Sequence, residues 1–170
     1  MRALGIDPGL VITGYGVVEH GSEGMTLIEA GIIDSGTAQD PLPVRLRRLH
    51  EEINELIAEQ QPDEMALEQL YSHYEHPRTA ILMGHARGVI CLAAGLHSIP
   101  LHHYAATKVK SAVTGNGRAS KAQIQQMVRR TFHLQEIMEP PDAADAVAIA
   151  MCHIQHRGVR SPSDYLHLLQ

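Results

Sequence analysis

The sequence predicts a mixed α/β domain with a five-stranded mixed sheet flanked by helices. Three β-like segments follow one another at the N-terminus, and the remaining chain alternates helical periodicity with short strand-like runs. The first three segments are joined by short turns and should pair as antiparallel strands. We expect strands at residues 2–7, 13–18, 25–33, 64–70 and 100–104.

Helical spacing of apolar residues begins after Pro43, runs from Leu46 to Ile57 and ends before Pro62. In this architecture the first and fourth strands are neighbours at the sheet centre, and the last helix packs over their ends. Further helices are expected at residues 79–97, 105–113 and 121–132, and from about residue 140 to at least 151.

Length and composition indicate one domain. The chain has 170 residues, of which 44% are apolar and 19% charged, enough for a real core. We place the domain at residues 1–157 and interpret residues 158–170 as a polar C-terminal tail. The N-terminus has no signal-peptide pattern, and no apolar run approaches the ~18 residues of a membrane span. Cys91 and Cys152 are isolated, which fits a reducing cytosol, so we expect a cytoplasmic protein with no membrane partner.

Four carboxylates occupy positions that are difficult to explain as surface: Asp7, Glu68, Asp142 and Asp145. Asp7 closes an apolar stretch before a Pro-Gly turn, and Glu68 lies inside a strand-like run. The two remaining acids are three residues apart, so they share one helix face. Several buried carboxylates require positive charge between them, and divalent cations with oxygen ligands are the simplest candidate.

Four acids at one locus can hold two Mg²⁺ ions, as two-metal phosphoryl transfer requires. The protein then supplies ligand placement rather than a covalent nucleophile. Because the sequence has no Gly-x-Ser-x-Gly elbow and no cysteine with an obvious paired base, a metal-dependent phosphate-cleaving enzyme is predicted. Structural interpretations remain for single residues: Asp7 could open a β-turn, and Asp142 or Asp145 could stabilise the helix start.

The distribution of charge points to a nucleic-acid partner. The formal net charge is −5, which by itself argues against one. From Leu101 to Gln135, however, there is no Asp or Glu. Six basic side chains fall in that stretch: Lys108, Lys110, Arg118, Lys121, Arg129 and Arg130. One basic face on an acidic protein is typical of a phosphate-backbone binder, with a solvated helix face as the alternative.

Five short motifs occur in a specific order along the chain. They are Leu4-Gly5-Ile6-Asp7-Pro8-Gly9, Thr13-Gly14-Tyr15-Gly16, Leu67-Glu68-Gln69, Ala86-Arg87-Gly88 and Asp142-Ala143-Ala144-Asp145-Ala146. From Met1 to about His156 the ordered set resembles the RuvC family, the bacterial Holliday junction resolvases. The resemblance implies a ribonuclease H-like fold. It also implies a crossover junction endodeoxyribonuclease: a homodimer that cuts four-way DNA junctions by paired, symmetric phosphodiester hydrolysis in recombination and repair.

The resemblance also implies roles for single residues. The family's metal-binding catalytic acids match Asp7, Glu68, Asp142 and Asp145, with two Mg²⁺ ions per site and Mn²⁺ as a possible substitute. Its catalytic lysines match Lys110 and Lys121. Tyr71 would stack on an unpaired base, with an ordinary boundary residue as the alternative. Further DNA contacts are assigned to Lys108, Arg118 and Arg78.

Partners follow from the same resemblance. The helix around residues 84–88 would form the dimer surface, because its small residues permit close helix approach; tight packing within one chain is the alternative. RuvA and RuvB, the branch-migration proteins, would be partners beside the junction. The histidine-rich segments have no obvious metal spacing, and we interpret them as solvated or phosphate-facing: His73, His76, His85, His102 and His103.

Three other functions are weighed against this one. The first motif pair also resembles the phosphate hairpin of actin-like ATPases and sugar kinases, which need a second domain and a second hairpin that this chain lacks. A related nuclease acting on other nucleic acid would share the carboxylates. A junction-binding module that recruits a helicase would leave Glu68 without a purpose.

Overall fold

Strands and helices follow the predicted order along the chain. The computed structural model describes residues 1–69 and 77–159, except for the side chains of residues 77, 78, 158 and 159. The strands are β1 (Arg2–Asp7), β2 (Ile12–Gly21), β3 (Gly24–Asp34), β4 (Glu64–Glu68) and β5 (Leu101–Tyr104). The helices are α1 (Leu42–Gln60), α2 (Pro77–Leu96), α3 (Ala106–Thr114), α4 (Lys121–Thr131) and α5 (Pro141–Val159).

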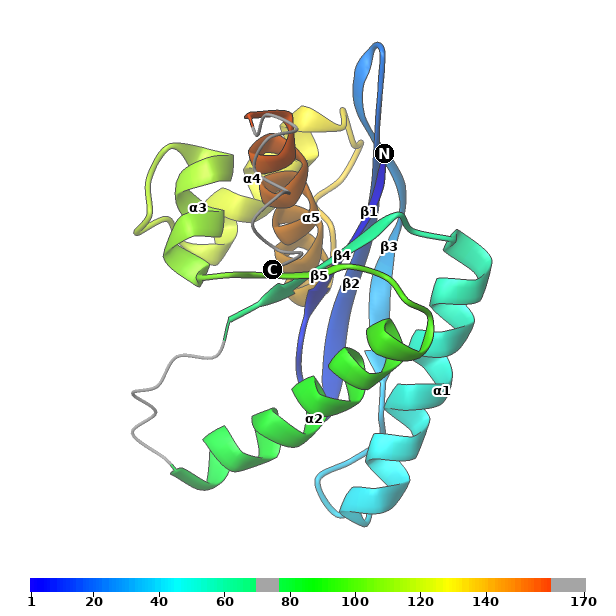
Figure 1. Ribbon diagram of the computed structural model, residues 1–170. Helices are drawn as coiled ribbons and strands as arrows, with labels where there is room; N and C mark the ends of the chain where they lie inside the picture. Colours follow the sequence, from blue (N-terminus) through cyan, green and yellow to red (C-terminus); the bar gives the residue numbers. More distant parts are fainter. Residues whose placement is uncertain (70–76, 160–170) are drawn as a thin grey trace.

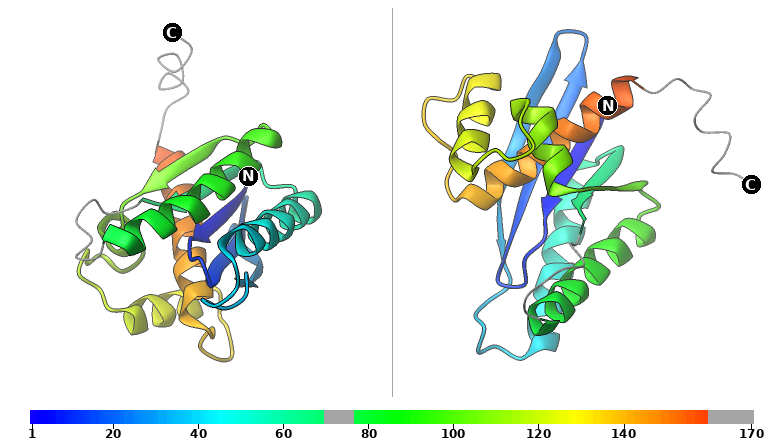
Figure 2. Two further views of the ribbon diagram at one scale, coloured as in Figure 1. Left: turned by 90° about the horizontal axis from the view of Figure 1, so that it is seen from below. Right: turned by 90° about the vertical axis from the view of Figure 1, so that its left-hand side faces the viewer.

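The five strands form one mixed sheet in the order β3-β2-β1-β4-β5. The three N-terminal strands pair antiparallel, as predicted, while β4 and β5 add in parallel beyond β1. Strands β1 and β4 are therefore neighbours, as expected. Helices cover both faces of the sheet, with α1 and α2 on one side and α3, α4 and α5 on the other (Figure 1; Figure 2).

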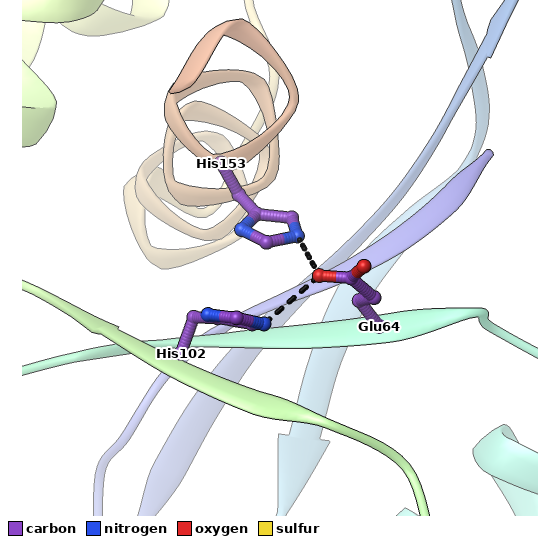
Figure 3. A group of neighbouring side chains, drawn as sticks. All are labelled: Glu64, His102 and His153. Atoms are coloured by element: carbon purple, nitrogen blue, oxygen red, sulfur yellow. Dashed lines mark ion pairs between the residues drawn. The ribbon is translucent and has the colours of Figure 1, made fainter. Parts of the chain in front are cut away.

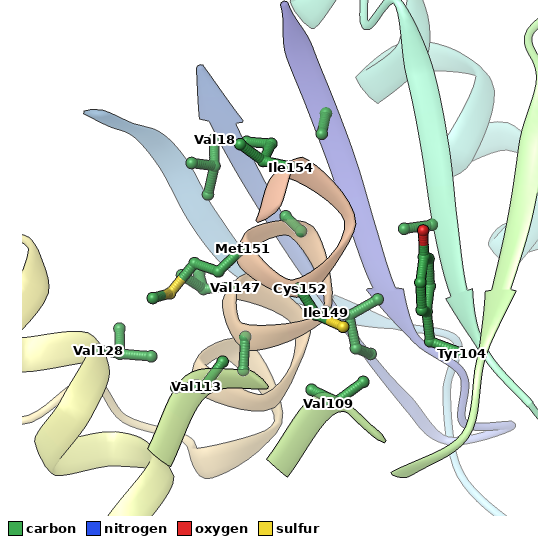
Figure 4. Packing of buried hydrophobic residues seen from close by; sticks show 14 of the residues in the cluster. Val18, Tyr104, Val109, Val113, Val128, Val147, Ile149, Met151, Cys152 and Ile154 are labelled. Atoms are coloured by element: carbon green, nitrogen blue, oxygen red, sulfur yellow. The ribbon is translucent and has the colours of Figure 1, made fainter. Parts of the chain in front are cut away.

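Alternation along β1 divides the core into two layers. Leu4 and Ile6 are fully buried against α1 and α2. The neighbouring strand in the sheet, β4, contributes Met65 and Leu67 to the same layer. Ala3 faces the opposite layer, where α5 packs (Figure 4). Because side chains alternate between the faces of a strand, the odd-numbered residues of β1 and the even-numbered residues of β4 face α5.

Helix α5 lies directly on the backbone of β1 and β2. A β-carbon added to Gly5 would collide with the carbonyl oxygen of Ala146, and one added to Gly16 would lie 2.5 Å from a methyl group of Val147. The absence of side chains at these glycines allows the helix to approach the sheet. Buried alanines on α5 complete this close packing: Ala143, Ala144, Ala146, Ala148 and Ala150.

The predicted polar tail begins too early. Helix α5 continues to Val159, so residues 158 and 159 belong to the last helix rather than to a separate segment. The helical hydrogen-bond ladder continues past the end of the apolar stripe, which the sequence pattern used as the limit. Residues 160–170 lie outside the described part of the chain.

Helix α2 is more apolar than the sequence analysis stated. Thr79–Leu96 spans 18 residues with a mean hydropathy of 1.5, which is long and apolar enough for a membrane span, and 22% of it is buried. His85 and Arg87 interrupt this stretch, so the sequence contains no unbroken apolar run of that length there. One face packs on the core through Ala86 and Ile90, so α2 is part of the folded domain and presents an apolar outer face.

Candidate active site

Parallel pairing of β1 and β4 brings two of the predicted acids together. Ile6 is paired with Leu67, so the next residue in each strand, Asp7 and Glu68, comes at the same level of the sheet. Both side chains point to the face covered by α5 because of their parity along the strands. Their carboxyl groups are close enough to hydrogen-bond.

The start of α5 brings the other two acids to the same end of the sheet. Gly14, which is paired with Asp7 across β1 and β2, lies against the backbone of Asp142. Asp145 follows one turn later on the same helix face, near enough to Asp7 to perturb its pKa. The described structure therefore gathers the four acids from three separate elements.

Three of these acids border a cavity of about 210 Å³ that is also lined by the two predicted lysines. Its lining residues are Asp7, Glu68, Ala106, Val109, Lys110, Lys121, Ile124, Asp145, Ala148 and Ile149. Asp142 does not line the cavity itself but acts electrostatically on Lys121. An apolar wall on one side and convergent charged groups on the other are typical of a site that binds a charged substrate.

Burial and like charge perturb the carboxyl group of Asp7. Burial, followed by the neighbouring carboxylates of Glu68 and Asp145, raises the pKa of Asp7 to about 8. The positive charge of Lys121 opposes this rise. A buried carboxyl group beside other carboxylates is the arrangement expected where a cation binds.

Lys121 occupies the first position of α4, where a cation is locally unfavourable because the helix N-terminus is positive. A capping box between Ser120 and Gln123 fixes this helix start. The Nζ of Lys121 lies 3.0 Å from the Oδ2 of Asp145, and the hydrogen bond to Asp145 raises the pKa of Lys121. The ion pair explains why a lysine is placed at this helix end.

Sequence reasoning missed two residues that shape the site. The hydroxyl of Thr13 donates to the carbonyl oxygen of Gly9 at 2.7 Å and accepts from its amide at 3.2 Å, which fixes the turn after Asp7. Arg87 donates to the carbonyl oxygen of Glu68 from helix α2. Both lie within motifs quoted for the family resemblance, and that was the signal available.

The predicted DNA contacts are distributed differently. Lys108 is exposed and places its Nζ 5.3 Å from the ring centre of Tyr104, so it lies away from the acid cavity. Arg118 is exposed in the loop before α4, where its amide donates to the side chain of Asn116 at 3.0 Å. Tyr71 and the side chain of Arg78 lie outside the described residues.

Comparison with known proteins identifies the family. The family model described as Crossover junction endodeoxyribonuclease RuvC matches residues 3–153. The chain belongs to the RuvC family. It is 55% identical to the Crossover junction endodeoxyribonuclease RuvC of Rhodopirellula baltica over 149 residues, which is 88% of this chain and 83% of that protein.

Other members of the RuvC family agree in sequence and in fold. The RuvC of Brevibacillus brevis is 42% identical over 164 residues, covering 96% of this chain and 98% of that protein. A solved structure described as Thermus thermophilus RuvC in complex with Holliday junction substrate has a TM-score of 0.85 at 32% identity, covering 92% of this chain and 94% of that one. The predicted ribonuclease H-like fold is confirmed.

Proposed function

We propose that this chain is a structure-selective endonuclease that resolves four-way DNA junctions, with Asp7, Glu68, Asp142 and Asp145 as its metal-binding acids. The observation that carries the proposal is the convergence of acids from β1, β4 and α5 on one cavity that also holds Lys110 and Lys121. Membership of a family whose members are named crossover junction endodeoxyribonucleases supports it.

The acid cluster suits hard divalent cations with oxygen ligands. Burial, and after it the negative charges of Glu68 and Asp145, raise the pKa of Asp7, and a bound cation would offset these effects. We assign two Mg²⁺ ions to the four acids, with Mn²⁺ as a substitute. When bound, such cations lower the pKa of water and neutralise charge that develops on the phosphodiester.

The two lysines have separate roles in the proposed reaction. Lys121 is held by Asp145 at the mouth of the cavity, where its charge meets the scissile phosphate and offsets the charge of the acids. Lys110 enters the cavity from α3 and serves as a second point charge for a backbone phosphate. The apolar wall, which includes Val109 and Ile124, limits the water that reaches the reacting phosphorus.

DNA would extend from this cavity over the acid-free stretch. That stretch forms β5, at the edge of the sheet, and α3 and α4, which lie on the α5 side of the sheet (Figure 1). Lys108 and Arg118 are exposed there and would contact phosphates beyond the cleavage site. Tyr71 would stack on an unpaired base near the crossover, and Arg78 would contact the backbone beside it.

The outer face of α2 fits a second copy of this chain. Ile81, Leu92 and Leu96 are 63%, 54% and 65% exposed, and added β-carbons at Gly84 and Gly88 would meet no atoms in the described structure. A large exposed apolar surface marks an interaction site. A two-fold dimer would supply the two equivalent sites that paired incision of a two-fold junction requires.

The same proposal places the dimer on recombination intermediates in the cytoplasm. The branch-migration proteins RuvA and RuvB would act on the same junction, and this partnership rests on the family resemblance alone.

An incision assay tests the proposed function. Purified protein and its Asp7→Asn variant would each be mixed with an end-labelled mobile four-way junction or an equal-length duplex, in Mg²⁺ or EDTA. We expect paired symmetric nicks only in the junction, only with Mg²⁺ and only with the wild type. Equal cutting of the duplex would refute junction selectivity. Binding without cutting under every metal condition would favour the recruitment module.

A further inference from the structure

A second group of potential metal ligands lies at the other end of β4. Glu64 at the start of β4, His102 on β5 and His153 on α5 point toward one another (Figure 3). The Nε2 atoms of His102 and His153 lie 2.9 and 3.0 Å from the same oxygen, Oε2 of Glu64. The side chain of His153 is fully buried, and those of Glu64 and His102 are 9% and 26% exposed.

The geometry of this group differs from that of an ordinary hydrogen-bonded network. Within the described part of the chain, Oε2 of Glu64 and Nε2 of His153 make no hydrogen bond of acceptable direction, although they lie 3.0 Å apart. The ring nitrogen therefore does not aim at the carboxylate oxygen. Two buried polar atoms that do not hydrogen-bond to each other lower the stability of the fold. A third atom that accepts both lone pairs would remove this cost.

The neighbours of this group favour the tautomer of His153 and the orientation of Glu64 that metal binding requires. The hydroxyl of Tyr104 lies 2.8 Å from Nδ1 of His153, so Nδ1 can carry the proton and leave the Nε2 lone pair available. Arg157 binds the other carboxylate oxygen of Glu64, which orients the carboxylate and leaves Oε2 directed at the two rings.

We propose that Glu64, His102 and His153 form a second metal site, for a transition-metal dication such as Zn²⁺. The candidate ligand atoms all lie within 4.8 Å of one another, and two imidazoles with one carboxylate form a known zinc ligand set with a water in the fourth position. Imidazole nitrogens favour Zn²⁺ over Mg²⁺, which prefers oxygen ligands. Of the three proposed ligands, His102 also lines a neighbouring cavity of about 120 Å³, together with His103, Tyr104, Lys108, His156 and Arg157.

The site would join β5 to β4 and α5, the two elements that also carry predicted catalytic acids. Glu64 and Glu68 occupy opposite ends of β4 on one face, and His153 and Asp145 share α5. At 3.3 Å per strand residue and 1.5 Å per helix residue, the two sites are separated by about 12–13 Å along both elements. Zn²⁺ bound there would hold β4, β5 and α5 together without entering the acid cavity.

Cobalt absorption tests the ligand set directly. Co²⁺ would be titrated into metal-free wild-type protein with excess Mg²⁺ present, because Mg²⁺ competes for carboxylate oxygens but not for imidazoles. We expect one Co²⁺ per chain with the intense visible absorption of four-coordinate Co²⁺. His102→Gln should weaken this binding by more than about 100-fold, since loss of an outer partner alone costs about 10- to 100-fold. Zn²⁺ at about 100 times its Kd should raise Tm by about 5–10 °C.

His103→Gln is the matched control, because His103 neighbours His102 on β5 but faces the other side of the sheet. It should retain the wild-type cobalt spectrum and affinity. Zinc-edge X-ray absorption of the wild type gives a readout that needs no variant, and two imidazole ligands are expected. Oxygen-only coordination, equal spectra for the two histidine variants, or no stoichiometric Co²⁺ binding would overturn the proposal in favour of a closed hydrogen-bonded network.

Discussion

Gly14 lies against Asp142 so closely that a β-carbon on the glycine would collide with the carbonyl oxygen of the aspartate. Strand β2 and the first turn of α5 are thus in backbone contact, and this contact sets the position of Asp142 and Asp145 relative to Asp7. Close packing at a glycine therefore serves the geometry of the acid cluster.

Gly14→Ala should displace the start of α5. Overpacking of this kind costs about 1–3 kcal/mol of unfolding free energy, and a displacement of about 1 Å at the reacting groups can lower the rate about 100-fold. Thermal unfolding and single-turnover junction cleavage would measure the two effects. Gly21→Ala is the control, because a β-carbon there meets nothing within 4 Å; equal behaviour of the two variants would contradict the positioning role.

Asp7→Asn should abolish cleavage and stabilise the metal-free protein. The pKa of Asp7 rises from 3.8 to about 8 in the folded chain, first through burial. The folded state therefore binds more protons than the unfolded state between these values, and stability falls as pH increases through that window. Asparagine does not titrate, so the variant avoids this loss. Its free energy of unfolding should exceed that of the wild type by at least about 1 kcal/mol at pH 8.

Urea unfolding in EDTA at several pH values would test this stability effect. The advantage of the variant should shrink as pH falls and disappear below about pH 3, where both states of the wild type are largely protonated at this site. A variant less stable than the wild type at pH 8 would contradict the raised pKa of Asp7.

Lys121→Ala should slow cleavage with little loss of junction affinity. The lysine contacts Asp145 and offsets the negative charge at Asp7, so its removal weakens stabilisation of the transition state by about 100-fold in rate. Single-turnover rates at saturating junction measure this effect. Arg130→Ala, at the far end of α4, should cleave at the wild-type rate, and an equal defect in both variants would exclude a local role for Lys121.

Lys110→Ala should reduce the salt dependence of junction binding. If Lys110 meets one phosphate, its loss lowers the slope of log affinity against log salt by roughly one. Binding of a catalytically inactive protein at several salt concentrations gives this slope. An unchanged slope would show that Lys110 contacts no phosphate.

Leu92→Glu should dissociate the proposed dimer. Leu92 is 54% exposed on α2, and a charge buried in an apolar interface is strongly unfavourable. Sedimentation velocity should show a monomer, and junction products should shift from paired to single nicks. Ile28→Glu, at a side chain 41% exposed on β3, should leave the mass unchanged. A dimer that survives Leu92→Glu would place the interface elsewhere.

Element order and the identity of the four acids were predictable from the sequence. The periodicity of a strand or a helix arises from contacts between residues a few positions apart, so it can be read locally. A glutamate at the end of an apolar strand is unusual in the same local sense, which is why Glu68 was identified.

The histidines show where local reasoning ends. The sequence pattern indicates a solvated or phosphate-facing His102 and no role for His153, but the structure brings both rings to Glu64. No spacing rule predicts this, because the three side chains come from β4, β5 and α5. Likewise, Lys108 and Lys110 are two positions apart, yet Lys108 lies over Tyr104 and Lys110 lines the acid cavity.

The sequence by itself determined which elements form and in what order, and it predicted four carboxylates as the ligands of a cation. Only the tertiary structure decided that β1 and β4 pair in the register that levels Asp7 with Glu68, and that the glycines admit α5 against the sheet. Register and close approach depend on packing between segments far apart in the chain, and packing is the outcome of the whole fold rather than of any local pattern.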